Sequence, residues 1–350
     1  MSVLRRSLLL GSGLAAAAAA SPSLFAQPAR PGATAGGGRR APRMLLGVKV
    51  MDPMPAQVRR FERWIGRRVD FVTHYTSQGD YGSIADTDLG RLNEGTPMDR
   101  PLEVSIPLCE ATGSLARTAR GAGDRAYTSL FRALAAARPA DPEIWIRPGW
   151  EFNGDWYPWS AGGKEGDYRA AFRRVAGLGR EVDRRFRFIW GWTYSSKMGD
   201  PMLAYPGDDA VDFFGNDVYR HKNYLGCDPA AAWNSQVTRR HGLAHWSDMA
   251  DRHGKAKTIN EFGVNADTCR DCHPEAKPTA RGAGCPYDDG APYVQAAHDW
   301  FVKVGVVAVS LWHEPTGYDG VLLAPSNERD PPAPRWPQTS GRIKQLFGAG

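Results

Sequence analysis

The chain has 350 residues, of which 42% are hydrophobic and 23% charged, and its formal net charge is +6. This length and composition can bury one large core, and α/β barrels of this size commonly form a single domain. The basic excess comes largely from arginines scattered along predicted helices, and no segment interleaves basic with aromatic residues. That pattern predicts a solvated basic surface and argues against a nucleic-acid partner.

The first residues have the pattern of an export signal. Arg5-Arg6 precede three leucines and an alanine-rich apolar run, and a cleavage point fits at Ala26. We therefore expect a signal peptide over residues 1–26, similar to twin-arginine signals, and a periplasmic or secreted protein with no membrane attachment after cleavage. An N-terminal anchor is the alternative, although the run is short for a membrane span. Residues 27–42 are rich in Pro, Gly and Ala and predict a flexible linker.

After the linker, strand-like runs alternate with helical patterns. The predicted strands cover residues 45–50, 69–75, 102–108, 143–149, 186–192, 211–219, 256–262 and 304–312. The clear helical patterns cover residues 56–65, 114–137, 167–183, 230–253, 293–303 and 338–347. This alternation predicts an α/β fold, a single-domain (β/α)₈ TIM barrel over residues 43–350, with an open doubly wound sheet as the alternative. In such a barrel the active groups lie at the C-terminal ends of the strands.

A carboxylate follows the fourth predicted strand among aromatic side chains. The apolar run 144–146 is ended by Pro148 and Gly149, and Glu151 comes next. Its aromatic neighbours in the sequence are Trp150, Trp156, Tyr157 and Trp159. Desolvation among aromatic rings raises the pKa of a carboxyl group, so Glu151 could donate a proton near neutral pH. A core of tryptophans beside a solvated glutamate is the alternative interpretation.

The stretch from Arg147 to Trp159 reads Arg-Pro-x-x-Glu-x-Asn-Gly-x-Trp-x-x-Trp. It resembles the fourth-strand signature of glycoside hydrolase family 26, the β-mannanases and their relatives in clan A. The resemblance implies that Glu151 is the acid/base, with Trp150, Asn153 and Trp156 as substrate contacts. The family usually has a histidine before this glutamate, where this chain has Trp150. The substrate could therefore be a mannan or, nearly as well, a β-glucan, a xylan or a bacterial exopolysaccharide.

A glycosidase needs a second carboxylate facing the first. The seventh predicted strand supplies Glu261, which lies 110 residues after Glu151 (261 − 151). Because clan A enzymes carry their two catalytic groups after strands four and seven, the resemblance implies that Glu261 is the nucleophile. A separation of about 5–5.5 Å between the carboxyl groups would mean retention of configuration, and roughly 6.5–9.5 Å would mean inversion.

Further candidates lie at the ends of other strands. The resemblance implies that Tyr219 hydrogen-bonds the nucleophile and that Trp312 lies under the cleavage subsite. Asp217 is either a substrate contact or a buried structural aspartate, and Trp192 either touches sugar or packs in the core. Glu314 is the rival carboxylate, expected in a loop. Arg147 could hold a carboxylate in place or form an ion pair inside the barrel, and Tyr75 could reach the rim of the site.

Five cysteines are present, and three of them follow the seventh predicted strand: Cys269, Cys272 and Cys285. In an exported protein this spacing favours a disulfide. A zinc site is one alternative, since Cys-x₂-Cys with a third Cys and His273 offers four ligands, and free thiols are the other. A haem attachment is rejected, because no second axial-ligand motif is evident.

The sequence thus predicts a monomeric, exported, retaining endo-β-glycanase that acts on a mannan-type or related β-linked polysaccharide without a cofactor or a catalytic metal. Alternatives within the clan are an endo-β-glucanase, a xylanase or an exopolysaccharide hydrolase. Alternatives from other classes are a non-catalytic carbohydrate-binding barrel and a zinc hydrolase that uses the cysteine-rich segment.

Overall fold

The structure is a computed structural model, and it describes residues 43–51, 54–86, 99–194, 197–220, 228–264, 290–314 and 336–348. The predicted signal peptide and linker lie outside the described residues. So does the cysteine-rich segment with its predicted disulfide. Cys109 is described, and it is a buried free thiol.

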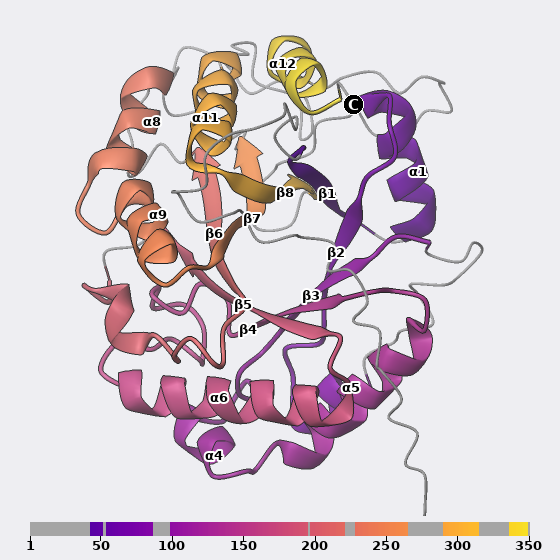
Figure 1. Cartoon of the computed structure of the whole chain (residues 1–350), viewed down its shortest axis with the longest axis vertical. Helices are drawn as coiled ribbons and strands as arrows, with labels where there is room; N and C mark the ends of the chain where they lie inside the picture. Colours follow the sequence, from indigo (N-terminus) through magenta and orange to yellow (C-terminus); the bar gives the residue numbers. More distant parts are fainter. Residues whose placement is uncertain are drawn as a thin grey trace, which may run out of the picture.

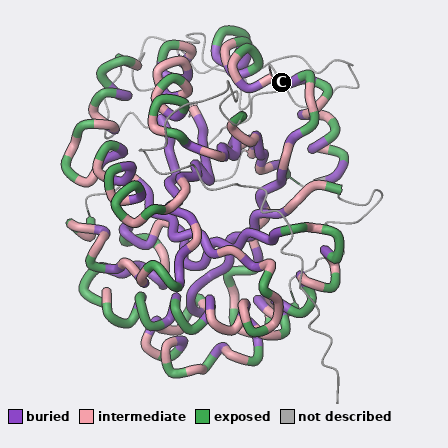
Figure 2. Tube along the Cα trace, in the orientation of Figure 1, coloured by how far each residue is buried: buried purple, intermediate pink, exposed green. Residues whose placement is uncertain are grey.

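Eight parallel strands form a closed barrel in which each strand pairs with its neighbours in sequence, and β1 pairs with β8. This confirms the predicted TIM barrel and rules out the open sheet (Figure 1). The strands are β1 (Leu45–Val50), β2 (Phe71–Tyr75), β3 (Leu102–Ile106), β4 (Ile144–Pro148), β5 (Phe186–Thr193), β6 (Phe213–Arg220), β7 (Ala256–Val264) and β8 (Val306–His313). Figure 2 shows the strands buried at the centre and the helices exposed on their outer faces.

The helices surround the barrel, and two of the predicted helices are each divided into two in the structure. The helices are α1 (Met54–Ile65), α2 (Tyr81–Ala85), α4 (Leu115–Ala119), α5 (Asp124–Ala137), α6 (Glu165–Val182), the 3₁₀ helix η1 (Pro201–Ala204), α8 (Pro229–Thr238), α9 (Leu243–Arg252), α11 (Ala291–Val304) and α12 (Pro337–Phe347). The predicted helix 114–137 is two helices, because Gly121 adopts a left-handed φ of 97°. The predicted helix 230–253 is likewise interrupted, at His241, where φ is 56°. Among the described residues, no helix combines the length and hydropathy needed to cross a bilayer.

The interior of the barrel is layered, because alternate residues of a strand point to the same face. The lowest layer is apolar and contains Phe71, Trp145 and Phe213, with the ring of Phe71 packed where a Cβ on Gly47 would overlap it. Two residues further along β2 and β4, Thr73 and Arg147 begin a polar layer. The apolar layer fills the barrel at the N-terminal ends of the strands. The polar groups therefore lie nearer the C-terminal ends of the strands.

A bulge in β7 determines which way the side chain of Glu261, the candidate nucleophile, points. Asn216 of β6 pairs with Ile259, but the next residue, Asp217, pairs with Glu261. Asn260 is therefore an extra residue in β7, and such bulges re-aim the side chains that follow them. The bulge places Glu261 opposite Asp217, in the polar upper part of the barrel.

Candidate active site

Glu151 lies three residues beyond the end of β4, on a tight turn with unusual backbone geometry. Its φ is +51°, in the left-handed region that non-glycine residues rarely adopt. Gly149, two residues earlier, is also left-handed, with φ of +56°. A non-glycine residue in such a conformation costs about 1–3 kcal/mol and persists where its surroundings hold it. Strain of this kind at a carboxylate is typical of functional sites.

Hydrogen bonds hold this turn in place. The Tyr168 hydroxyl donates to the carbonyl of Gly149 at 3.1 Å, and the Trp159 indole donates to the carbonyl of Trp150 at 2.8 Å. The carbonyl of Glu151 accepts from the Gly154 amide at 2.9 Å, while the Glu151 amide donates to the carbonyl of Gly191 at 3.1 Å. Three successive carbonyls are thus satisfied, and two of the donors are buried aromatic side chains with a polar end. The aromatic cluster therefore fixes the backbone that carries Glu151.

The Glu151 carboxyl group is half-buried and has a raised pKa. Burial raises it to about 7, and the nearby charge of Glu261 adds to the effect. The Trp156 indole donates to Glu151 Oε2 at 2.9 Å and works in the opposite direction, because it favours the charged form. The expected rise in pKa is confirmed, and its chief cause is the predicted one, desolvation. Glu151 can therefore hold a proton near neutral pH and can also give it up.

Both carboxylate oxygens of Glu261 accept hydrogen bonds. Oε2 accepts from the Tyr219 hydroxyl at 2.7 Å, which confirms the contact predicted for Tyr219. Oε1 accepts from Arg147 at 2.7 Å and from the hydroxyl of Tyr75. The side chain is 8% exposed. Donors on both oxygens fix the orientation of the carboxyl group, as a nucleophile that must meet its substrate in one geometry requires.

Arg147 is the fully buried centre of the charged network. Its guanidinium contacts Asp217 at 2.5 Å, Glu261 at 2.7 Å and Glu103 at 3.6 Å. Its Nε donates to Ser105 at 2.9 Å. Both predicted roles for Arg147 therefore apply, since it forms a barrel ion pair and also holds a candidate catalytic carboxylate. Arg147 ties the polar layer of the barrel to the site above it.

Aromatic side chains line the site around the two glutamates. Trp312 is half-buried and meets Tyr75 and Tyr219 edge to face, with ring centroids 5.8 and 6.1 Å away. It therefore lies between the two tyrosines that bind Glu261. Trp156 is 49% exposed, so part of its indole is open to solvent beside Glu151. Aromatic faces at these two places suit the C–H surface of a sugar ring.

Four other predicted substrate contacts offer almost no surface in this structure. Trp150, Asn153, Trp192 and Asp217 are each 1% exposed. Trp150 packs against Trp159, and Asn153 exchanges two hydrogen bonds with the backbone of Thr193, at 2.7 and 2.8 Å. Trp192 stacks on His245, and Asp217 pairs with Arg147. All four therefore support the site, and a ligand could reach them only if neighbouring side chains moved.

Two participants in the network have weak signals in the sequence. Tyr75 was expected at the rim, whereas its hydroxyl lies between Arg147 and Glu261. Glu103, buried on β3, was not anticipated, and burial raises its pKa to about 7 against the opposing charge of Arg147. An acidic residue in an apolar strand was the available signal for Glu103. The rival carboxylate Glu314 forms an ion pair with Lys49 at 2.7 Å.

Removing the hydroxyl of Tyr219 tests whether its contact with Glu261 matters. Hydrogen bonds to charged groups contribute about 1.5–3 kcal/mol, so Tyr219→Phe should lower kcat by roughly 10- to 100-fold if Glu261 reacts. Initial rates of glycan hydrolysis measure the loss. Tyr127→Phe is a matched control, because that buried hydroxyl donates to the carbonyl of Pro107 at 2.9 Å, outside the charged network. Equal rates for the two variants would remove Tyr219 from the site.

Comparison with known proteins connects this site to a family. Residues 133–271 match the sequence profile of glycosyl hydrolase family 26, and this segment contains both Glu151 and Glu261. A mannan endo-1,4-beta-mannosidase of Bifidobacterium adolescentis is 29% identical over 129 residues, 35% of this chain. Endoglucanase H of Acetivibrio thermocellus is 36% identical over 86 residues, 22% of this chain. The matches cover 12% and 9% of those proteins, about a tenth of their length.

Solved structures share the fold at low sequence identity. The catalytic domain of a Bacillus sp. JAMB-750 GH26 endo-beta-1,4-mannanase superposes with a TM-score of 0.56 at 15% identity, covering 87% of this chain and 88% of that one. A modular endo-beta-1,4-mannanase from Cellulomonas fimi gives 0.55 at 16% identity, covering 87% and 70%. At such identities the likeness bears on the fold alone.

Proposed function

Because the chain carries a glycosyl hydrolase family 26 domain, we propose that it is a retaining β-glycanase in which Glu151 is the acid/base and Glu261 the nucleophile. One observation carries the proposal. A carboxyl group with a pKa of about 7 lies within electrostatic reach of a second carboxylate that receives donors on both oxygens. Two neighbouring carboxyl groups, one desolvated and one held by donors on both oxygens, are a pair that glycoside hydrolysis requires, and the resemblance to family 26 supports double displacement by that pair.

The chemistry then runs in two steps. The Glu261 carboxylate attacks the anomeric carbon while the glycosidic C–O bond breaks, and the proton of Glu151 passes to the leaving oxygen. The product is a glycosyl-enzyme ester and a shortened glycan. In the second step the Glu151 carboxylate takes a proton from water as the water oxygen attacks the same carbon. The ester bond to Glu261 breaks, and both glutamates return to their starting states.

For the substrate we propose a β-linked polysaccharide of the mannan type or a related β-glycan, cleaved within the chain. The endo-mannosidase and endoglucanase names of the partial relatives support this class. The exposed part of the Trp156 indole beside Glu151 supports a sugar-binding subsite there. An endo-β-glucanase, a xylanase or an exopolysaccharide hydrolase is the nearest alternative, because Trp150 occupies the place of the family's usual histidine.

We also propose that the protein is exported and acts as a monomer in the periplasm or medium. The arginine pair and apolar run of the first 26 residues support export, and a polymer substrate outside the cytoplasm fits it. Detection of the mature N-terminus near residue 27 in a cell envelope or culture fraction would test the first proposal. Light scattering of the purified protein would test the second.

A panel of soluble β-mannan, β-glucan and xylan tests the activity. Release of reducing ends, with products of several lengths from the start, supports an endo-acting hydrolase. The anomer first formed, observed by proton NMR, distinguishes retention from inversion. Binding of a glycan without cleavage by the unmodified chain would instead favour the carbohydrate-binding barrel. Activity that is lost to a chelator but kept in Glu151→Ala and Glu261→Ala would favour the metal hydrolase.

The pKa of Glu151 predicts the basic side of the pH profile. The acid must be protonated to donate, and that form is lost as the pH rises through about 7, so kcat/KM should decline above this pH. Trp156→Phe removes a donor that favours the charged form, so the decline should move to higher pH. Trp300→Phe, in α11, is a control that leaves the Glu151 contact intact. A shift to lower pH, or none, would contradict the assigned acid.

A further inference from the structure

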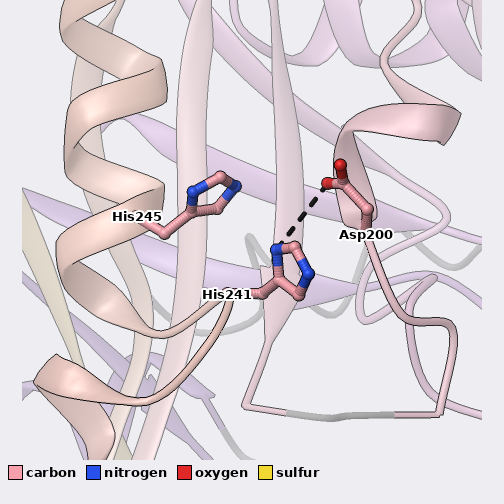
Figure 3. Close-up of side chains that lie close together, drawn as sticks. All are labelled: Asp200, His241 and His245. Carbon is pink, nitrogen blue, oxygen red and sulfur yellow. Dashed lines mark ion pairs between the residues drawn. The ribbon is translucent and has the colours of Figure 1, made fainter.

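Three side chains that can bind a metal ion lie together outside the network of glutamates. Asp200 caps the N-terminus of η1, His241 lies two residues before α9, and His245 lies in the first turn of α9. Their candidate ligand atoms all lie within 4.8 Å of one another, and His241 Nδ1 is 3.8 Å from Asp200 Oδ1. Figure 3 shows the three side chains turned toward one another from two separate segments of the chain.

The two imidazoles have buried nitrogens without partners. Among the described residues, neither nitrogen of His241 accepts or donates a hydrogen bond, and the same holds for Nε2 of His245. A buried polar atom left unpaired costs free energy, and natural structures usually explain it by an ion or a water. A cation between the rings would satisfy nitrogens on both histidines at once.

The backbone at His241 brings the rings together. Its left-handed φ of 56° ends the connection from α8 and turns the chain into α9. Histidine, like asparagine and aspartate, is enriched among the non-glycine residues that adopt this conformation. The rings of His241 and His245 meet edge to face, with centroids 4.9 Å apart and an interplanar angle of 81°.

The donor types at this cluster also suit a metal. An imidazole ring nitrogen that carries no proton donates its lone pair to a metal ion. Asp200 contributes the carboxylate that offsets part of the cation's charge.

We propose that Asp200, His241 and His245 bind a divalent transition-metal ion of the zinc class. Two imidazoles and one carboxylate form a borderline donor set that zinc prefers, and water completes a tetrahedral shell. Zinc holds such ligands at about 2.0–2.2 Å, so the atoms must draw together by roughly 1 Å, within the reach of side-chain rotation. The proposal is independent of the reaction assigned to the glutamates.

The ion would join two segments at the rim of the barrel. Asp200 belongs to the connection between β5 and β6, whereas the histidines belong to the connection between β6 and β7. The ring of Trp192, at the end of β5, lies parallel to that of His245, with centroids 6.0 Å apart and an interplanar angle of 9°. A bound ion would therefore stabilise the β5–β6 and β6–β7 connections beside the active site, and it takes no part in the chemistry.

The experiment uses the full chain stripped of metal with a chelator and then titrated with Zn²⁺ or Co²⁺ alone. We expect the Tm to rise on the order of 5 °C at about 100 times the Kd. Bound Co²⁺ should show visible d–d bands without a thiolate charge-transfer band, which separates this site from the cysteines outside the described residues. Mg²⁺ should have no comparable effect, because it prefers oxygen ligands.

Variants that keep the local backbone test the ligands. His241→Asn tolerates the left-handed conformation, Asp200→Asn retains an acceptor for the Met202 amide, and His245→Gln stays in the helix. Each should weaken Co²⁺ binding by on the order of 100-fold or more, since even outer partners of a site contribute about 10- to 100-fold. His253→Gln is the control, because His253 pairs with Asp208 at 2.8 Å at the other end of α9. Unchanged affinity in the folded ligand variants, or a spectrum dominated by thiolate, would overturn the proposal.

Discussion

Replacing Glu261 with glutamine should lower turnover by about 10³-fold or more, because the amide cannot form the glycosyl-enzyme. The same loss is expected for Glu151→Ala with substrates whose leaving group needs a proton. Both variants should fold, since the glutamine oxygen can still accept from Arg147 while its NH2 group can donate to the Tyr219 hydroxyl oxygen, and Glu151 is half-buried on a surface turn. Initial rates on the best glycan of the panel measure both effects.

Glu314→Gln is the matched control for these losses. Glu314 directly follows β8 and pairs with Lys49 at 2.7 Å, so its loss removes an ion pair without removing either proposed catalytic group. We expect its turnover to stay within about tenfold of the unmodified chain. A smaller loss for Glu261→Gln than for Glu314→Gln would reverse the assignment of the nucleophile.

Glu261→Gln should also have a second effect, which a merely structural role for Glu261 would not produce. The charge of Glu261 is the second cause of the raised Glu151 pKa, after burial, so Glu261→Gln should lower the pKa of Glu151. Carbon-13 NMR of the labelled Glu151 carboxyl group measures it without any turnover. An unchanged titration would mean that the two carboxyl groups do not interact.

The sequence allowed the barrel and the main groups of the site to be predicted, for a physical reason. Strand periodicity and terminal Pro or Gly residues mark where strands end, and barrel topology then brings those ends together. Glu151 and Glu261 were located this way, whereas the nucleophile role of Glu261 and its contact with Tyr219 were expected from the resemblance to family 26. The kinks at Gly121 and His241 were missed, because helical periodicity continues through each of them and a single left-handed residue leaves little trace in it.

Burial and pairing inside the barrel were harder to predict. Trp150 and Trp192 looked like sugar contacts by position, yet each is packed on other rings and 1% exposed. Glu103 carries no motif, and its partner Arg147 lies 44 residues away in sequence (147 − 103). Such contacts depend on register and on which rotamers fill the barrel, which neither periodicity nor composition contains.

Among the substitutions proposed for this chain, Arg147→Met should cause the largest loss of stability. It leaves Asp217, Glu261 and Glu103 without the cation that they share. Removing one partner of a buried ion pair typically costs about 3–5 kcal/mol, since the remaining charge stays buried. Urea denaturation measures the difference in the free energy of unfolding. Arg173→Met is the control, because its two hydrogen bonds to Asp209, both 2.6 Å, are exposed and should contribute less than about 1 kcal/mol.

The loss in Arg147→Met should depend on pH with a definite sign. Burial already raises the pKa of Glu103 to about 7 and that of Asp217 well above its usual value, while Arg147 opposes both shifts. Without the arginine, both pKa values rise further in the folded chain. The folded variant then binds more protons than the unfolded chain, and its stability falls as the pH rises. The deficit relative to the unmodified chain should therefore be smaller at about pH 5 than at about pH 8. An equal loss of unfolding free energy at both pH values would mean that Arg147 stabilises the chain by packing, and not by pairing with the buried carboxylates.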